Sequence, residues 1–299
     1  MTSDIEPQAP SRRVENGTAL ILMGTGMFLF SAVDAAAKIL TEGLHPFQIV
    51  WARQLGLLAA ACLLLALHGP KLFRTRHLNL QILRGLVAVC SASAFIFALR
   101  HVALADAVAV SFVAPFMVTL MGAVILREPV GIRRWAAVTL GFVGTLIILR
   151  PGMGVVHPAA TLVIAAAFFF AVRQVISRAI ADTDTTGTTV LYTALVGSIL
   201  LTIPLPWVWV TPHEFEIAVL VGMAVLAALA EIFVIKALER GLAVVVAPMQ
   251  YTLILWGTLY GWLVFGQLPD VWTLVGAAII VATGLYTIRR EYIVSRGRR

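Results

Sequence analysis

Charged residues are scarce in this sequence. Asp, Glu, Lys and Arg make up 12% of the 299 residues, against roughly 25% in soluble globular proteins. Hydrophobic residues make up 60% of the chain, so it has too few polar side chains to cover a surface that faces water. We therefore expect lipid to be its solvent, which excludes a large extramembrane domain and most classes of soluble enzyme.

Cysteine and the common catalytic motifs are also missing or sparse. The two cysteines, Cys62 and Cys90, each lie in an apolar run, where cysteine is more often a small buried side chain than half of a disulfide or a metal ligand. The six histidines form no HExxH, and no GxSxG, P-loop or CxxC pair occurs. The stretch 182–185, Asp-Thr-Asp-Thr, resembles a phosphotransferase motif, but we interpret it as helix capping and turn chemistry. We therefore predict no enzyme activity, no cofactor and no metal site.

Long apolar runs dominate what is present. A membrane-spanning helix needs about 20 apolar residues, and runs of that kind recur along the whole chain, separated by short connections. They are too long and too uniformly apolar for the alternating strands of a membrane barrel. The sequence therefore predicts an all-α membrane protein with ten transmembrane helices, at 18–40, 47–68, 80–100, 105–126, 132–149, 159–180, 188–207, 214–238, 243–265 and 271–288.

The basic residues fix an orientation for these spans. The net charge is +7, and 22 residues are Lys or Arg. If the N-terminus is cytoplasmic, only Arg100 and Arg150 fall in outer connections, and Lys38, Arg53 and Arg173 lie within spans. Cytoplasmic segments of membrane proteins carry such an excess of positive charge, so both termini are expected to be cytoplasmic. The basic balance is then a topology signal, and we expect no nucleic-acid partner.

The two halves of the chain resemble each other. At an offset of 140 residues, Gly26–Leu40 aligns with Ala166–Ile180, so that Asp34 meets Gln174; a chance alignment of apolar helices is the alternative. Because each half holds five spans, an odd number, the halves would cross the membrane in opposite directions as inverted repeats. The expected organisation is a cytoplasmic tail at 1–17, repeats at 18–152 and 153–290, and a basic cytoplasmic tail at 291–299.

The stretch 98–152 also resembles a known family. It reads ALRHVALADAVAVSFVAPFMVTLMGAVILREPVGIRRWAAVTLGFVGTLIILRPG, and the likeness is to the EamA repeat of the drug/metabolite transporter superfamily. It is carried by the Ala-Leu opening, Pro115, Arg127-Glu128-Pro129, the Gly141/Gly144 helix and the final Arg-Pro-Gly. The second copy at 237–290 departs from the family at Gln267, where Glu is usual. The resemblance implies a transporter similar to bacterial amino-acid exporters of the YddG type, with a cavity lined by spans 1, 3, 4, 6, 8 and 9.

Ionisable side chains inside spans are costly, so each needs a reason. Asp34 and Lys38 lie one helical turn apart in the first span, a spacing at which an acid and a base can pair. We expect the pair to line a central cavity, where it would hold an amino-acid ammonium or carboxylate, or a coupling proton. The alternative is a neutralised pair near the outer end, with Lys38 extending to the surface.

The sixth and eighth spans carry further candidates. Arg173 and Gln174 lie in the segment that aligns with the Asp34 region. Because an arginine can hold a carboxylate through two parallel hydrogen bonds, Arg173 is a candidate for substrate binding or gating, with a structural pair between helices as the alternative. Glu231 lies deep in the eighth span, where it would partner Arg173 or take up a proton.

Prolines interrupt two spans. Pro115 breaks the fourth span and Pro248 the ninth, and such breaks often border the binding sites of transporters. Gln250 and Tyr251 follow the second break, and Tyr251 aligns with Phe112 in the first half. These aromatic rings would suit an apolar pocket, with ordinary packing as the alternative. The candidate site residues are thus Asp34, Lys38, Phe112, Pro115, Arg173, Gln174, Glu231, Gln250 and Tyr251.

Other residues have structural interpretations. For Arg53 we expect an ion pair between helices, and for Asp106 and Glu128 a structural role. Gly257 and Gly261 form a GxxxG pattern that indicates close helix packing, with an oligomer interface as the weaker option.

Three classes of function were compared: a secondary active transporter, a channel and an intramembrane enzyme. The sequence has no repeated selectivity element for a channel and no catalytic constellation within its spans. We therefore favour an exporter of amino acids, aromatic and other neutral ones first, or of similar small metabolites, in the bacterial inner membrane. A carrier of riboflavin or of a nucleotide-linked compound is the alternative. The expected partners are the substrate, the lipid bilayer and, as a candidate coupling ion, protons; we expect a monomer, with a homodimer as the alternative.

Overall fold

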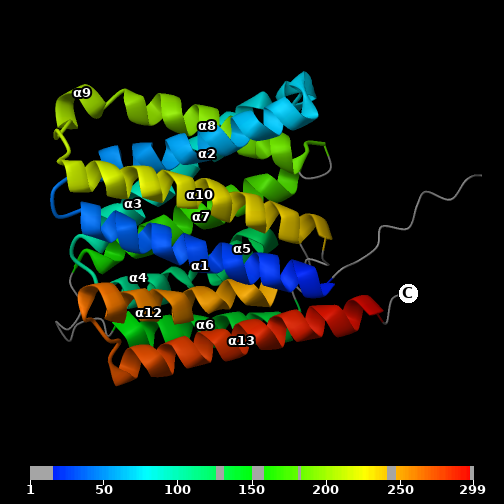
Figure 1. Ribbon diagram of the computed structural model, residues 1–299. Helices are drawn as coiled ribbons and strands as arrows, with labels where there is room; N and C mark the ends of the chain where they lie inside the picture. Colours follow the sequence, from blue (N-terminus) through cyan, green and yellow to red (C-terminus); the bar gives the residue numbers. More distant parts are fainter. Residues whose placement is uncertain (1–15, 126–130, 150–157, 181–182, 241–246, 297–299) are drawn as a thin grey trace, which may run out of the picture.

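The computed structural model is a bundle of helices that run side by side (Figure 1). It describes residues 16–125, 131–149, 158–180, 183–240 and 247–296, and none of these residues forms a strand. The elements are α1 (Asn16–Leu40), α2 (Pro46–His68), η1 (Pro70–Phe73), α3 (Leu78–Leu99), α4 (Leu104–Ser111), α5 (Ala114–Val124), α6 (Ile132–Leu149), α7 (Ala160–Ile180), α8 (Thr186–Thr202), α9 (Leu205–Val208), α10 (Glu214–Arg240), η2 (Ala247–Tyr251), α12 (Thr252–Phe265) and α13 (Val271–Arg296).

In the described parts of the chain, six helices are long and apolar enough to cross a membrane: Gly17–Leu40, Pro46–Leu67, Leu78–Leu99, Leu104–Val124, Ala160–Ile180 and Glu214–Ala237. Helices such as these satisfy their own backbone hydrogen bonds, as lipid requires. Shorter apolar helices occur at Thr139–Ile148, Thr186–Thr202 and Val271–Tyr286. The all-helical membrane fold is therefore confirmed. Each of the ten predicted ranges contains helix, but the count of ten spans and the cytoplasmic position of the termini stay predictions.

The packing of the helices follows the predicted repeat. Helix α1 packs on α10 and on α12, and the equivalent helix of the second half, α7, packs on α3 and on α5. Likewise α2 packs on α10 as α8 packs on α3, while α6 and α13 pack on each other. Each of these contacts therefore has its counterpart when every helix is replaced by its repeat equivalent. The chain begins α1 and ends α13 at the same, right-hand end of the bundle in Figure 1.

Proline breaks the fourth span where the sequence indicates. Helix α4 ends at Ser111 and α5 begins at Ala114, with Pro115 in its first turn. Pro115 has no N–H to donate to the carbonyl of Ser111, and its ring would clash with that carbonyl. In the second half, η2 carries the equivalent break and α12 begins only at Thr252. Helix α4 packs on α12, so the two broken spans contact each other.

The GxxxG pattern serves close packing within the chain. Gly257 and Gly261 are both buried on α12. A Cβ at Gly257 would lie 3.2 Å from the Val108 side chain on α4. One at Gly261 would lie 3.3 Å from the backbone oxygen of Gln267 and 3.9 Å from the backbone nitrogen of Ala105 on α4. The interpretation as close packing within the chain is therefore confirmed. Gly266 then ends α12 with φ of 63°, a left-handed conformation that favours glycine.

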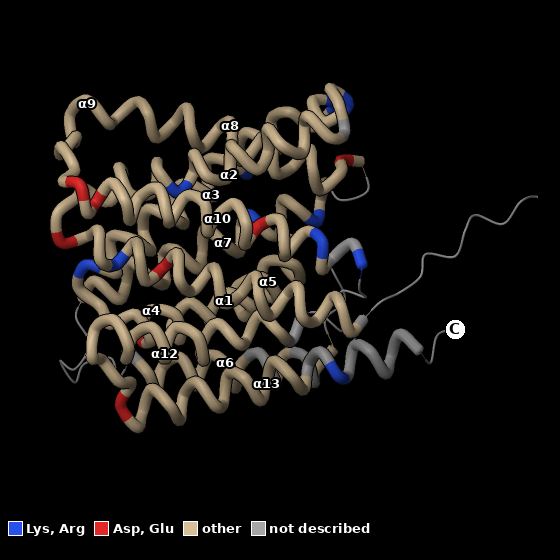
Figure 2. Tube along the Cα trace, viewed as in Figure 1, with Lys and Arg blue, Asp and Glu red and all other residues tan. Residues whose placement is uncertain are grey.

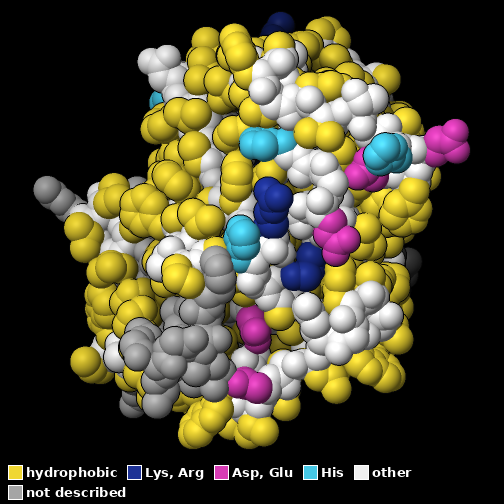
Figure 3. All heavy atoms as spheres, turned by 90° about the vertical axis from the view of Figure 1, so that its left-hand side faces the viewer, with side chains coloured by type: hydrophobic (Ala, Val, Ile, Leu, Met, Phe, Trp, Pro, Cys, Tyr) yellow, Lys and Arg dark blue, Asp and Glu magenta, His cyan; other side chains and the backbone are white. Residues whose placement is uncertain are grey.

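Polar contacts join the helices at the left-hand end of the bundle. The side chain of Gln48 exchanges two hydrogen bonds with the backbone of Val210, at 2.9 and 3.1 Å. Asp106 accepts a hydrogen bond from Thr273 at 2.9 Å, in keeping with its expected structural role. Figure 3 views this end and shows charged and histidine side chains gathered in the middle of the face, with hydrophobic side chains around them. Glu128 and the motifs at 127–129 and 150–152 lie outside the described residues.

At the right-hand end, Asp184 joins the two halves. Its carboxylate accepts hydrogen bonds from the Thr75 hydroxyl at 2.5 Å, the Gln81 amide at 2.8 Å and the Arg76 backbone at 3.3 Å. Thr185 caps α8 through its side chain, so the capping and turn interpretation is confirmed for the described part of the Asp-Thr-Asp-Thr stretch. Burial raises the pKa of Asp184, but these hydrogen bonds outweigh it and hold the pKa below its usual value.

Replacing Asp184 by asparagine should lower the stability of the protein at neutral pH. A carboxylate whose pKa is lowered by folding stabilises the folded state above the unfolded pKa, about 3.9, and this contribution is lost as the pH falls through the folded pKa. Thermal unfolding in detergent should therefore show a gap between wild type and Asp184→Asn at pH 7 that narrows below about pH 4. A gap that stays constant over this range would contradict the assignment.

Candidate functional site

A cavity of about 290 Å³ lies within the bundle, among helices of both halves. This is at the small end of the range for small-molecule sites. Its lining comes from α1, α2, α3, α4, α5, α7, η2 and α12, and from the turn between α4 and α5. The residues are Asp34, Arg53, Ala88, Ser91, Ala92, Phe95, Ser111, Phe112, Ala114, Pro115, Ala166, Ala167, Phe170, Arg173, Gln250 and Leu253.

The cavity brings together five of the predicted site residues: Asp34, Phe112, Pro115, Arg173 and Gln250. They are separated by up to 216 positions in the sequence, so the fold alone places them around one space. The second span contributes to the lining through α2, which the family resemblance did not imply. No described residue of α10, the eighth span, is part of the lining. Figure 2 shows charged positions well inside the bundle as well as at its two ends.

Asp34 forms an ion pair with Arg53 on α2, with 3.4 Å between the guanidinium nitrogen and the carboxylate oxygen. The predicted pair with Lys38 is therefore wrong. Lys38 donates instead to the backbone carbonyls of Leu99 and Val102, at 3.0 and 2.5 Å. The last carbonyls of a helix have no partner within it, and Lys38 meets that of Leu99, the last residue of α3, and that of Val102 in the turn that follows. The expected ion pair of Arg53 between helices is confirmed.

Arg173 projects from α7 at the side of the cavity nearer the right-hand end of the bundle. Its guanidinium lies over the ring of Phe170, 4.7 Å from the ring centre, where the face of the ring attracts a cation. Its buried Nε has no hydrogen-bond partner among the described residues. Arg173 therefore keeps hydrogen-bonding capacity that the protein itself does not use.

Arg84 on α3 lies behind Arg173 and is held by neutral groups. Its Nε donates to the Ser177 hydroxyl at 2.7 Å, and a terminal nitrogen donates to the Thr193 hydroxyl. Ser177 in turn donates to the backbone carbonyl of Arg173 at 2.7 Å. In the sequence, Arg84 lies near the start of the predicted span 80–100, where an arginine ordinarily belongs to the positive charge of the cytoplasmic side. A sequence signal that could have identified Arg84 is its helical spacing from Ser91 and from the other residues of α3 that line the cavity.

Glu231 on α10 acts on this group of arginines from outside the cavity lining. Its carboxylate interacts electrostatically with Arg173, Arg84 and Arg53, in that order of strength. No direct ion pair of Glu231 is formed within the described parts of the chain, so the predicted partnership with Arg173 is one of longer range. Three arginines and two carboxylates thus lie at or next to the cavity.

Aromatic rings form the less polar part of the site. Phe112 stacks on Tyr251 with 5.2 Å between ring centres and 21° between planes. These two residues are repeat equivalents, so the two broken spans meet through their aromatic rings. Tyr251 supports Phe112 from behind, whereas Phe95 and Phe170 face the cavity. Gln174 is partly buried beside Arg173 on α7 but is not part of the lining.

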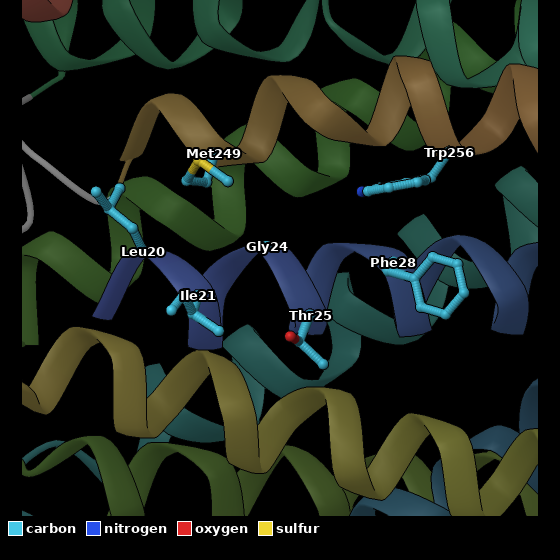
Figure 4. Close-up of a pocket in the computed structure, with 7 residues that line it drawn as sticks. All are labelled: Leu20, Ile21, Gly24, Thr25, Phe28, Met249 and Trp256. Atoms are coloured by element: carbon cyan, nitrogen blue, oxygen red, sulfur yellow. The ribbon is translucent and has the colours of Figure 1, made fainter. Parts of the chain in front are cut away.

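A second hollow differs in chemistry from this cavity. It has a volume of about 380 Å³ and lies between α1 and α12 (Figure 4). Its lining is Leu20, Ile21, Gly24, Thr25, Phe28, Met249 and Trp256. The hollow carries no ionisable side chain, and Ile21 is 72% exposed at its edge. It is an apolar surface groove, and the central cavity is the site with polar chemistry. In neither place does the described chain gather three or more residues that could hold a metal ion.

Several known proteins are similar to this chain in sequence or in fold. The S-adenosylmethionine uptake transporter of Rickettsia conorii is 27% identical over 275 residues, which cover 90% of this chain and 94% of that protein. A riboflavin transporter of Vibrio cholerae is 32% identical over 76% of each chain, and the pseudopaline exporter of Pseudomonas aeruginosa is 27% identical over 90% of this chain and 94% of its own. A solved crystal structure with a TM-score of 0.63 and 20% identity covers 92% of this chain and 98% of its own, which shows a shared fold.

The family match falls on both halves of the chain. The EamA-like transporter family matches residues 17–150 and again residues 157–289, which agrees with the two repeats seen in the packing. The resemblance found at 98–152 is thereby confirmed. The chain belongs to the EamA-like transporter family of the drug/metabolite transporter superfamily.

Proposed function

We propose that this protein is a secondary active transporter that exports amino acids, aromatic and other neutral ones first, across the bacterial inner membrane. The observation that carries the proposal is the central cavity, which is lined by both repeats and combines buried charges with aromatic rings. An amino acid offers the matching groups, a charged head and an apolar side chain. The family and the relatives support transport of small metabolites in general.

Alternating access is the mechanism that the repeated packing supports. Because contacts in one half have counterparts in the other, the halves can exchange conformations and expose the cavity to one side and then the other. Polar contacts between the halves, Asp184 with Gln81 and Gln48 with Val210, lie at opposite ends of the bundle. We propose that each is released when the cavity opens at its end.

Uptake of S-adenosylmethionine or riboflavin is the alternative, because relatives carry those names. The aromatic rings in the lining also suit the flat rings of both compounds. The cavity, at about 290 Å³, favours a smaller substrate. We further propose that protons are the coupling ion, with Asp34 or Glu231 as the group that takes them up, and that the working unit is a monomer.

The proposed function is tested by counterflow in proteoliposomes. Liposomes loaded with unlabelled phenylalanine should accumulate labelled phenylalanine transiently and saturably, since a carrier exchanges solute across the membrane. A panel of neutral, basic and acidic amino acids, S-adenosylmethionine and riboflavin, run with and without a pH gradient, ranks the substrates. Saturable counterflow of riboflavin alone would replace the amino-acid proposal, and no counterflow of any compound would contradict transport of this panel.

Replacing Asp34 by alanine should reduce transport at least about tenfold while folded protein still reaches the membrane. The change leaves Arg53, whose side chain is 27% exposed, without its carboxylate partner and so makes the lining of the cavity more positive. Glu42→Gln, which removes an exposed acid beyond the end of α1, is the matched control and should transport like wild type. Initial rates and the size-exclusion profile of each purified variant check the prediction. Wild-type rates in Asp34→Ala would remove Asp34 from the site.

A further inference from the structure

The charges around the cavity do not balance. Asp34 is paired with Arg53 at 3.4 Å. Glu231 is the other acid of the group, and it attracts Arg173, Arg84 and, least of the three, Arg53. Three guanidinium groups therefore face two carboxylates, and the surplus positive charge lies on the α3 and α7 side, where Arg84 and Arg173 repel each other. A buried surplus of this kind calls for an anion.

Among the three arginines, Arg173 is the one placed to bind that anion. Arg53 uses a terminal nitrogen on Asp34, and Arg84 donates to Ser177 and to Thr193 and does not line the cavity. Arg173 lines the cavity, and its buried Nε has no partner in the described chain. The Phe170 ring covers one face of the guanidinium and so leaves its edge for hydrogen bonds. A planar guanidinium edge matches a carboxylate, which it can bind through two parallel hydrogen bonds.

Among the described residues of the lining, none offers a substrate ammonium a comparable partner. The acid nearest the cavity, Asp34, already holds Arg53, and an added cation would increase the positive surplus. The aromatic rings suit an apolar ring instead. On α3, Phe95 lies toward Leu99 and the left-hand end of the bundle, while Arg173 on α7 lies toward Ile180 and the right-hand end. A molecule with a carboxylate at one end and a ring at the other therefore matches the positions of Arg173 and Phe95 along the bundle.

We propose that Arg173 anchors the substrate through a free carboxylate, and that the substrates are small aromatic carboxylates with or without an α-amino group. The proposal rests on the transport function proposed above and narrows it: the carboxylate is recognised and the ammonium is not. Aromatic amino acids are then one subset of a wider class that includes their desamino analogues.

Three probes of one ring type test this in the wild-type protein. We expect phenylalanine and 3-phenylpropionate, which keep the carboxylate, both to show counterflow and to bind the detergent-purified protein. We expect phenethylamine, which keeps only the ammonium, to do neither. Binding of phenethylamine equal to that of phenylalanine, or failure of 3-phenylpropionate to bind, would overturn the proposal.

Variants of Arg173 test the anchor itself. Arg173→Gln should weaken the binding of 3-phenylpropionate by roughly ten- to a hundredfold, the loss expected for a charged hydrogen bond, and Arg173→Lys should restore part of it. Arg178→Gln removes the same charge from the exposed end of the same helix and should bind like wild type. If Arg173→Gln fails to fold, Arg173→Lys and the three probes still decide the question. Wild-type binding in a folded Arg173→Gln would overturn the proposal.

Failure of this proposal can be told apart from failure of the proposed function. Counterflow of riboflavin, with no counterflow of any compound that carries a carboxylate, would support a transport function but would overturn the carboxylate anchor. Absence of counterflow for every compound would contradict the transport function. Binding of 3-phenylpropionate that is lost in Arg173→Gln would support the anchor in either case, because it is measured on purified protein without transport.

Discussion

The arrangement of the central region depends on one constraint, the cost of burying charged side chains inside a bundle of helices that is surrounded by lipid. An ionisable side chain away from water must be paired, hydrogen-bonded or exposed to a polar cavity. The chain meets this requirement in three ways: Asp34 pairs with Arg53, Arg84 donates to hydroxyl groups, and Arg173 lies over the ring of Phe170 and lines the cavity. The third arrangement is the least complete within the protein, because the buried Nε of Arg173 has no partner in the described chain.

These charges lie around a cavity between the two duplicated halves of the chain. Two proline breaks place repeat-equivalent rings, Phe112 and Tyr251, in contact at the centre of the bundle. A broken helix leaves backbone groups and side chains free to line a cavity where an unbroken helix would fill it. In the proposed mechanism, the contacts of Asp184 with Gln81 and of Gln48 with Val210, at the two ends, are released in turn while the lining stays in place. In this account the site and the mechanism both follow from one internal symmetry.

The sequence predicts the helices well because apolar runs must span lipid, and it predicts the cavity in part. Asp34, Phe112, Pro115, Arg173 and Gln250 could be found because charges, prolines and aromatic rings are conspicuous in apolar spans. The partner of Asp34 could not, because sequence spacing shows neighbours on one helix, such as Lys38, and not those on α2.

Arg84 was missed for a related reason. It lies near the start of its span, where arginine ordinarily marks the cytoplasmic side, and only packing reveals its contact with Ser177. Glu231 is the opposite case. Its depth in the span predicts an electrostatic role, and the structure shows one, although over a longer range than a direct ion pair. Positions along a helix are therefore predictable here, whereas contacts between helices require the folded arrangement.

The central claim is that one cavity between the repeats is reached from either side of the membrane. Replacing Ser111, which lines it, by cysteine in a protein without Cys62 and Cys90 gives a single labelling position. A membrane-impermeant maleimide applied to oriented vesicles should react from each side in turn, and phenylalanine or 3-phenylpropionate should slow both reactions. Labelling from neither side, or from one side only under all conditions, would contradict alternating access at this cavity.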